Sequence, residues 1–210
     1  MYYIVALGNP GEEYELSRHN MGRLVVDVFL EKQGIDREDY KDDKGLKALV
    51  WKGETKGGGK FQVIYPETFM NNSGKSVKPL ADKMIKEKKV KDSTKKEKNC
   101  ESLVVVHDDL DIGLGSYKIC YGRGSAGHKG VDSIIKAVKT KNFVRIRVGV
   151  RPTTPSGKLK KISDAKKLDF IIGNLKPKEL DTVEKMNKTL ADALEVMVDE
   201  GKNKAMSLFN

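Results

Sequence analysis

The chain has 210 residues, of which 38% are hydrophobic and 33% charged, and its formal net charge at pH 7 is +10. This length suits one domain, residues 1–210, with a core of its own. No apolar run approaches the roughly 20 residues that span a bilayer, and no secretion signal opens the chain, which excludes membrane-spanning classes. Cys100 and Cys120 are the only cysteines, which favours two reduced thiols in a cytosolic protein.

Much of the positive charge lies in one segment, residues 83–100. From Lys83 to Lys98 there are eight lysines against three acidic residues, a net charge of +5. The segment has almost no apolar periodicity, which predicts an exposed, lysine-rich insertion that acts as a solvated linker. A basic chain is compatible with a polyanionic partner, but its charge alone does not identify one.

The first elements are predicted from short apolar runs and their spacing. Tyr2–Leu7 is apolar and bounded by glycine, which predicts a buried strand. Apolar residues then recur at helical spacing over Met21–Gln33, and Gly34 is placed to end that helix. Lys47–Lys52 and Lys60–Tyr65 alternate enough to be two strands, joined as a hairpin by GETKGGG.

Strands and helices continue to alternate along the rest of the chain. We expect a helix over Val77–Ile85, strands over Ser102–Val106, Ser116–Tyr121 and Phe143–Val150, a helix around Ile134–Val138 and a C-terminal helix over 177–201. This order predicts an α/β fold: a single-domain three-layer sandwich, with a mixed, mostly parallel, twisted central sheet flanked by helices.

Three polar segments follow predicted strands: GNPGEEY, PETFMNNSG and HDDLD. If their strands are parallel neighbours, the functional crevice lies beyond their carboxyl ends. The side chains that would then converge are Asn9, His19, Asn71, Asn72, His107, Asp108 and Asp109. A histidine that takes a proton from water, a carboxylate that orients it and amides that bind the carbonyl oxygen would suit hydrolysis of an ester or amide.

Each of these residues also has a purely structural interpretation. A loop histidine is often exposed or caps a helix, Asp108 and Asp109 are ordinary turn residues, and Asn9 before Pro10 fits a turn. The glycines match neither a phosphate-binding loop nor the dinucleotide fingerprint. The cluster from His107 to Asp111 lacks a partner cluster at metal-ligand spacing, and no G-x-S-x-G elbow is present. The residues alone indicate a hydrolase-like α/β domain.

Four segments together carry a more specific signal. LGNPGEEYELSRHNMG, PETFMNNSG, VVVHDDLDIGLG and GRGSAGHKGVDSI resemble successive motifs of the bacterial-type peptidyl-tRNA hydrolase family, in the same order. The similarity runs from about Tyr2 to Gly149 and, more weakly, through Phe170–Leu175 and the last helix. It implies a monomeric cytoplasmic esterase that releases a peptide from tRNA. It also implies no metal or organic cofactor, no membrane and no obligatory protein partner.

The resemblance also implies roles for individual residues. His19 would be the general base that activates water, Asp108 the carboxylate that supports it, and Asn9 the residue that recognises the blocked aminoacyl group. The residues implied to contact the tRNA end and the peptide are Tyr14, Phe69, Met70, Asn71, Lys129 and Arg147.

The sequence departs from the family pattern at several places. Lys129 stands where the family usually has asparagine, so an ammonium that only donates hydrogen bonds replaces an amide. Cys120 stands where a basic residue is frequent, and Arg123 or Arg147 could compensate. Residues 83–100 and 151–168 are enlarged, and the second region resembles a lid. A catalytically silent RNA-binding relative is the alternative, but the retained base and carboxylate favour an enzyme.

Overall fold

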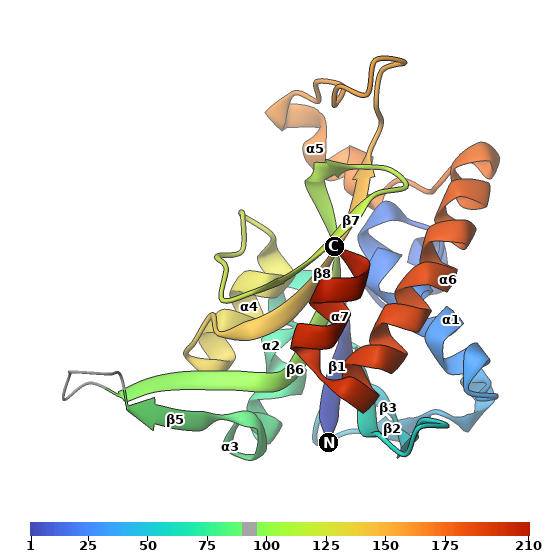
Figure 1. The fold of residues 1–210 in the computed structure, drawn as a ribbon. Coiled ribbons are helices and arrows are strands. Elements are labelled where there is room, and N and C mark those ends of the chain that lie inside the picture. The colour runs from blue at the N-terminus through green and yellow to red at the C-terminus, as the bar shows by residue number, and fades with distance from the viewer. Residues whose placement is uncertain (90–95) are drawn as a thin grey trace.

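The computed structural model describes residues 1–89 and 96–210. Its strands are β1 (Tyr2–Ala6), β2 (Lys41–Asp43), β3 (Ala48–Glu54), β4 (Lys60–Pro66), β5 (Lys86–Lys89), β6 (Lys96–Gly113), β7 (Tyr117–Tyr121) and β8 (Phe143–Arg151). Its α-helices are α1 (Met21–Lys32), α2 (Gly74–Val77), α3 (Ala81–Met84), α4 (Lys129–Val138), α5 (Asp164–Ile172), α6 (Pro177–Glu200) and α7 (Lys202–Phe209). Figure 1 shows their arrangement.

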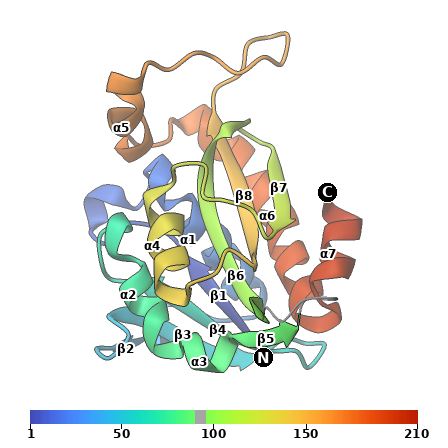
Figure 2. The same ribbon diagram turned by 90° about the vertical axis from the view of Figure 1, so that its left-hand side faces the viewer.

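The strands form one sheet in the order β2-β3-β4-β1-β6-β8-β7, with β5 paired to the outer part of β6. β4, β1, β6 and β8 are parallel, and the other strands join antiparallel. Helices α1, α6 and α7 cover one face, and α2, α3 and α4 cover the other (Figure 2). The predicted three-layer sandwich with a mixed, mostly parallel sheet is confirmed.

The central strands are apolar throughout because both faces of the sheet are covered. Successive residues of β1 illustrate this: Ile4 and Ala6 pack under α1 and α6, whereas Tyr3 and Val5 pack under α2 and α4. The sheet therefore has a hydrophobic core on each side. Because the central strands pack on both faces, their ends have defined positions, and so do the loops that follow these ends.

Two predicted elements differ in the structure. HDDLD was expected to be a loop, but β6 continues through it to Gly113, because β8 pairs with residues 104–109 in parallel register. The helix expected over Val77–Ile85 is broken into α2, a 3₁₀ turn (Lys78–Leu80) and α3. Pro79 explains the break, since it lacks the N–H that a continuous helix needs there.

The lysine-rich segment is also more regular than predicted. Residues 86–89 and 96–99 pair as an antiparallel ribbon at the start of β6 (Figure 1), with Glu87 opposite Lys98. These parts of the expected linker are therefore strands, and opposite charges across the ribbon favour the pairing. The remainder of the expected linker, residues 90–95, lies outside the described residues.

The C-terminal third agrees only in part with expectation. The predicted helix over 177–201 is confirmed as α6, whereas α7 was not predicted. Of the region expected to be a lid-like loop, 151–168, the last five residues are helical and belong to α5. Figure 1 shows α5 and the preceding loop standing above the carboxyl end of the sheet. Within the described residues, no helix has the length and apolar character to cross a membrane.

Candidate active site

The polar segments that were predicted to converge lie side by side at the carboxyl end of the parallel strands. β4, β1 and β6 are neighbours, so the segments that follow β1 and β4 lie beside residues 107–109 of β6. His19 comes from the 3₁₀ turn η2 (Arg18–Asn20) between β1 and α1, and only 7% of its surface is exposed. An exposed loop histidine is therefore the wrong interpretation of His19.

His19 and Asp108 form a hydrogen-bonded pair, with 2.8 Å between Nδ1 and Oδ1. Burial opposes ionisation of Asp108, but the neighbouring imidazoles and their hydrogen bonds hold the pKa of its carboxyl well below the ordinary value. An ionised carboxylate only accepts hydrogen bonds, so His19 Nδ1 carries the proton and donates it. In the neutral ring His19 Nε2 is then left free to accept a proton.

A second histidine shares the same carboxylate oxygen. His128 Nε2 lies 2.9 Å from Asp108 Oδ1. On its other side, His128 Nδ1 accepts hydrogen bonds from the backbone N–H groups of Gly130 and Val131 and so caps the N-terminus of α4. Its Nε2 must therefore carry the proton that Asp108 accepts. Sequence reasoning did not assign this contact to His128; the available signal was its place directly before a helix.

The third histidine, His107, lies beneath this pair in the core. Its Nδ1 donates to the backbone oxygen of Asp108 at 2.7 Å, and its ring meets the His128 ring edge-on at a centroid distance of 4.7 Å. Burial, and then the neighbouring His128 and Arg145, hold the pKa of His107 well below its ordinary value. A neutral His107 thus supports Asp108 and His128 from below without facing the cavity.

Asn9 is held with its amide in one orientation. Its Oδ1 accepts a hydrogen bond from the backbone N–H of Met70 at 2.9 Å. Asn20 bonds the backbone of Asn9 twice, through Oδ1 at 2.7 Å and Nδ2 at 3.0 Å. The Asn9 Nδ2 group is therefore the part left to donate to another molecule. Asn20 is a second residue that sequence reasoning missed; it stands next to His19 in the first motif.

The residues expected to contact substrate differ in their accessibility. Phe69 is 61% exposed and Asn71 is exposed, whereas Met70 is buried beneath them. Tyr14 is half-buried in the 3₁₀ turn η1 (Glu12–Tyr14), and among the described residues its hydroxyl bonds none of the groups above. The structure therefore brings together His19, Asp108, Asn9 and Met70, and places Phe69 and Asn71 on the adjoining surface.

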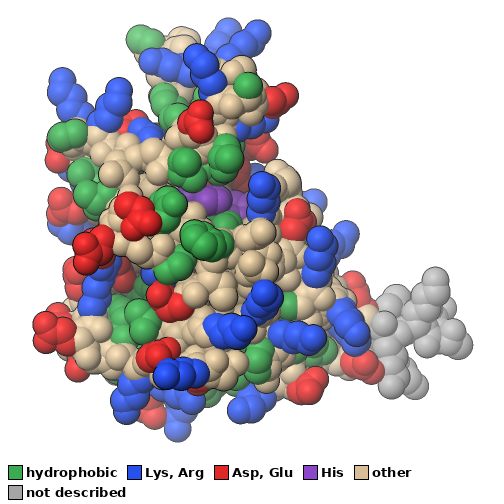
Figure 3. All heavy atoms as spheres, turned by 180° about the vertical axis from the view of Figure 1, so that it is seen from behind, with side chains coloured by type: hydrophobic (Ala, Val, Ile, Leu, Met, Phe, Trp, Pro, Cys, Tyr) green, Lys and Arg blue, Asp and Glu red, His purple; other side chains and the backbone are tan. Residues whose placement is uncertain are grey.

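A cavity of about 390 Å³ opens over His19, Asp108 and His128. One wall is α5, which contributes Leu168 and Ile171, and another is the loop before α4. Figure 3 shows the imidazoles in a hollow, with hydrophobic side chains gathered around it and basic side chains nearby. Lys129 lines this cavity as the exposed first residue of α4.

A second, basic hollow of about 500 Å³ adjoins the first, with Ala126 bordering both. Its basic lining residues are Lys118, Arg123, Arg145 and Arg147, and among the described residues none of its lining side chains is acidic. Arg147 Nε also bonds Asp109 at 2.7 Å, so Arg147 lies between the two hollows. Cys120 lines the basic hollow as well, where the family resemblance would have placed a cation.

His19, Asp108 and His128 each offer one atom that could bind a metal ion, and these atoms lie within 4.8 Å of one another. The nitrogen–oxygen distances of 2.8 and 2.9 Å are those of charge-assisted hydrogen bonds. Both bonds end on one oxygen, so an ion would have to displace both shared protons. A site that works without metal stays a prediction.

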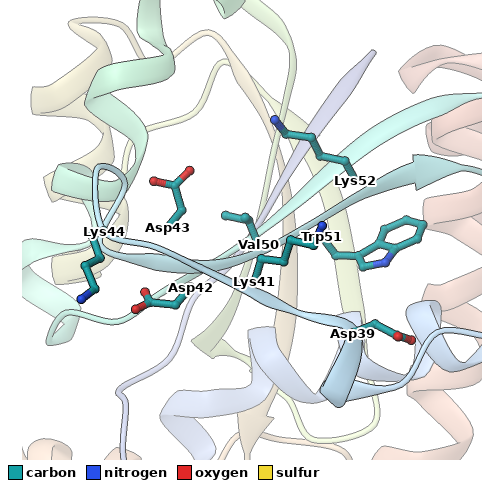
Figure 4. A pocket seen from close by; sticks show the side chains of 8 residues that line it. All are labelled: Asp39, Lys41, Asp42, Asp43, Lys44, Val50, Trp51 and Lys52. Carbon is teal, nitrogen blue, oxygen red and sulfur yellow. The ribbon is translucent and has the colours of Figure 1, made fainter.

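A larger hollow lies elsewhere, at the β2–β3 edge, and measures about 740 Å³ (Figure 4). Its side chains do not converge: Lys44 and Trp51 stand at opposite ends of the view. Its lining contains three aspartates and three lysines but no histidine. Size alone therefore does not mark the candidate site, and the smaller cavity over His19 is the one lined by a histidine–carboxylate pair.

Comparison with known proteins identifies the family of the chain. The sequence profile described as peptidyl-tRNA hydrolase matches residues 3–210. The chain belongs to the peptidyl-tRNA hydrolase family. A peptidyl-tRNA hydrolase of Solibacter usitatus is 37% identical, covering 100% of this chain and 94% of the relative. One from Thermodesulfovibrio yellowstonii is 35% identical, covering 100% and 99%.

Solved structures of the family have the same fold. The crystal structure of peptidyl-tRNA hydrolase from Acinetobacter baumannii superposes with a TM-score of 0.81 at 26% identity, covering 100% of this chain and 94% of that one. A second crystal structure, of a peptidyl-tRNA hydrolase in complex with N-propanol, gives the same values. The expected family and fold are therefore confirmed.

Proposed function

We propose that this chain hydrolyses the ester bond that joins a peptide, or an N-blocked aminoacyl group, to the terminal ribose of tRNA. The observation that carries the proposal is the His19–Asp108 pair, 2.8 Å apart at the base of the cavity. Membership of a hydrolase family supports the same conclusion. The proposed enzyme is a cytoplasmic monomer that recycles tRNA from abandoned translation and needs no cofactor or obligatory protein partner.

In the proposed mechanism, His19 Nε2 takes a proton from a water molecule while the water oxygen attacks the ester carbonyl. Asp108 keeps the Nδ1 proton in place and stabilises the imidazolium that forms. The tetrahedral intermediate then collapses, the bond to the ribose oxygen breaks, and His19 returns the proton to that oxygen. Asn9 Nδ2 donates to the carbonyl region of the blocked aminoacyl group, with Asn71 beside it.

The two hollows divide the substrate between them in this proposal. The cavity beneath α5 takes the peptide end, since Leu168 and Ile171 give it an apolar wall, and loop 152–163 with α5 acts as the lid. The basic hollow, with Arg147 at its border, takes phosphates of the tRNA backbone. Tyr14, Phe69, Met70 and Lys129 flank the junction between aminoacyl group and ribose.

The decisive test is release of a labelled N-acetyl-aminoacyl group from tRNA by the purified protein. His19→Ala should lower turnover by about two to four orders of magnitude, the usual worth of a positioned base, and leave tRNA binding nearly unchanged. Asp108→Asn should lower it less, because the imidazole remains but loses its orienting anion. Near wild-type turnover in His19→Ala would show that the base is wrongly assigned.

The same assay separates the enzyme from a catalytically silent RNA-binding relative. Tight tRNA binding without turnover by the wild-type protein would favour the binder. Neither the family profile nor the relatives named above support that alternative. A protein that only binds RNA would also have no chemical need for a buried base–carboxylate pair.

A further inference from the structure

We propose that Arg18 is a positioning residue that holds α5, one wall of the cavity, in a fixed position relative to His19. The inference rests on the proposed hydrolysis for its activity readout. Arg18 is the residue before His19 in the turn η2, and only 5% of its surface is exposed. Arg18 therefore supports the turn that carries His19, although its guanidinium points away from the cavity.

The guanidinium of Arg18 binds the C-terminal end of α5. Its Nη1 donates to the carbonyl oxygens of Gly173 and Asn174, both at 3.0 Å, and lies 3.4 Å from that of Phe170. The guanidinium also stacks over the Phe170 ring at 4.4 Å from its centroid. A cation at a helix C-terminus satisfies carbonyls that the helix leaves unpaired and complements its dipole.

The other arm of the fork ties Arg18 to the start of α6. Arg18 Nη2 pairs with Glu179 Oε2 at 2.6 Å, and the same oxygen accepts the backbone N–H of Lys176 at 2.8 Å. Arg18 thereby spans the connection between α5 and α6. A lysine has a single nitrogen without a planar fork, so it cannot satisfy both helix ends at once.

α5 depends on this anchor because it has little else to hold it. The helix is nine residues long and buries none of them. Helices of this length are marginal on their own in water, and burial of an apolar face normally supplies their stability. Leu168 and Ile171 of α5 line the cavity over His19, so loss of the anchor changes the cavity wall.

The backbone couples the same anchor to His19. The Arg18 N–H donates to Gly173 O at 3.2 Å, and Leu175 N–H donates to Leu16 O at 2.8 Å. Ser17 and Asn174 form an antiparallel bridge between these two bonds. A shift of residues 173–175 therefore moves η2, and a displacement of the base by about 1 Å can cost roughly 100-fold in rate.

The first experiment compares Arg18→Lys with a matched control, Arg37→Lys. Arg37 also pairs with two carboxylates, Glu15 at 3.0 Å and Asp27 at 2.6 Å, but away from the cavity. We expect Arg18→Lys to lower kcat/KM by roughly 10- to 100-fold and to speed hydrogen exchange of residues 164–175. Arg37→Lys should change neither.

The second experiment restores the contact in another way. Residues opposite each other in an antiparallel bridge have Cα atoms about 4.5–5.5 Å apart, which a disulfide can span. Ser17→Cys with Asn174→Cys, placed in the Arg18→Lys protein, should recover most of the lost kcat/KM when oxidised and lose it again on reduction. The same pair in the otherwise wild-type protein should leave turnover nearly unchanged in both states.

Three results would overturn the proposal. The first two concern Arg18→Lys alone: an unchanged kcat/KM, or a lowered kcat/KM without faster hydrogen exchange of α5. The third is that oxidation of the cysteine pair slows hydrogen exchange of α5 in the Arg18→Lys protein but does not restore kcat/KM. A wild-type protein without turnover is a different result, since it overturns the proposed hydrolysis itself. The comparison with wild-type turnover therefore separates the two failures.

Discussion

At the scale of single residues, the Asp108 carboxylate serves two imidazoles through one oxygen atom. His19 donates from Nδ1 and His128 from Nε2, at 2.8 and 2.9 Å. The helix α4 fixes the tautomer of His128, because its first N–H groups occupy Nδ1. His128 therefore has two separable tasks: it caps a helix with one nitrogen and orients Asp108 with the other.

Two substitutions of His128 should separate these tasks. In His128→Asn the amide oxygen can replace Nδ1 as the helix cap but does not reach Asp108, so turnover should fall about tenfold or more while stability is kept. In His128→Gln the amide nitrogen can replace Nε2 at Asp108, but the cap is lost, which should lower the free energy of unfolding by about 1 kcal/mol. Turnover and urea unfolding of both variants provide the check; the opposite pattern would contradict this division.

Lys129 follows His128 and is the place where the chain departs from its family. If its ammonium meets the reacting oxygen or a phosphate, Lys129→Asn should keep activity within about tenfold, because both groups donate, whereas Lys129→Ala should lose more. One such donor is worth at most about 2.7–4 kcal/mol at an oxyanion site. Both variants should also melt higher, since a cation is unfavourable in the first turn of α4. Equal turnover for Lys, Asn and Ala would remove Lys129 from the site.

Sequence reasoning located some of these residues and missed others for a physical reason. His19, Asp108 and Asn9 lie in segments that follow parallel strands, and strand order alone brings such segments together. Arg18 acts through a contact with the end of α5, 155 residues along the chain, and His128 through a contact with Asp108 of β6, 20 residues before it. Spacing in the sequence carries no signal of such contacts.

At the scale of elements, apolar runs predicted the central strands well, whereas a polar run was wrongly expected to be a loop. β6 runs through His107, Asp108 and Asp109 because β8 pairs with it there, a tertiary effect that outweighs local composition. The short edge strand β2 was not predicted, since its three residues, Lys41–Asp43, are all charged. α7 was not predicted, and the helix over Val77–Ile85 was expected to be continuous because its apolar spacing hid the effect of Pro79.

The ribbon of β5 and the start of β6 provides a test at this scale. Lys98 and Asp108 lie ten residues apart on one strand, and β6 has an irregularity between Cys100 and Val104. Cys100 and Asp108 pair with Phe143 and Val148 of β8, five residues apart, so the ribbon begins more than about 17 Å from the site. Replacing residues 89–96, which carry four lysines and one aspartate, by Asn-Gly should leave turnover unchanged.

The salt dependence of tRNA binding distinguishes a solvated ribbon from an RNA contact. In wild type, log affinity should fall steeply with log salt, and each phosphate contact removed should flatten that slope by about 0.7–0.9. The shortened ribbon should keep the wild-type slope. As the matched control, Arg123→Ala in the basic hollow should flatten it. A flatter slope in the shortened protein would make the ribbon an RNA contact.

At the scale of the whole molecule, the buried His107 makes stability depend on pH. The pKa of His107 in the folded protein lies well below the ordinary value, because of burial and of His128 and Arg145, with Asp108 opposing. In the unfolded chain the value is about 6.5, so at lower pH the unfolded state binds the extra proton. The contribution of His107 is therefore complete above about pH 6.5 and is lost as pH falls, with a limiting slope of about 1.4 kcal/mol per unit.

The measurement is urea unfolding of wild type and His107→Asn between pH 5 and 8. The asparagine amide can still donate to the Asp108 carbonyl, but it cannot bind a proton, so the variant should show a shallower loss of stability on acidification. Asp108 does not interfere, since a carboxyl with a lowered pKa contributes its pH dependence below about pH 4. The other titrating groups are common to both proteins. Parallel curves would contradict the assignment.

The gathering of the imidazoles has a practical consequence for spectroscopy. The chain has three histidines, and His19, His107 and His128 all belong to the group around Asp108. In an imidazole NMR spectrum of the untagged protein, every resonance therefore reports on this group, without selective labelling. The ring-nitrogen chemical shifts report each tautomer inferred above. A bound substrate analogue would change these shifts, and no histidine outside the group contributes a signal. A polyhistidine tag would hide these signals, so its removal is the first step of such a study.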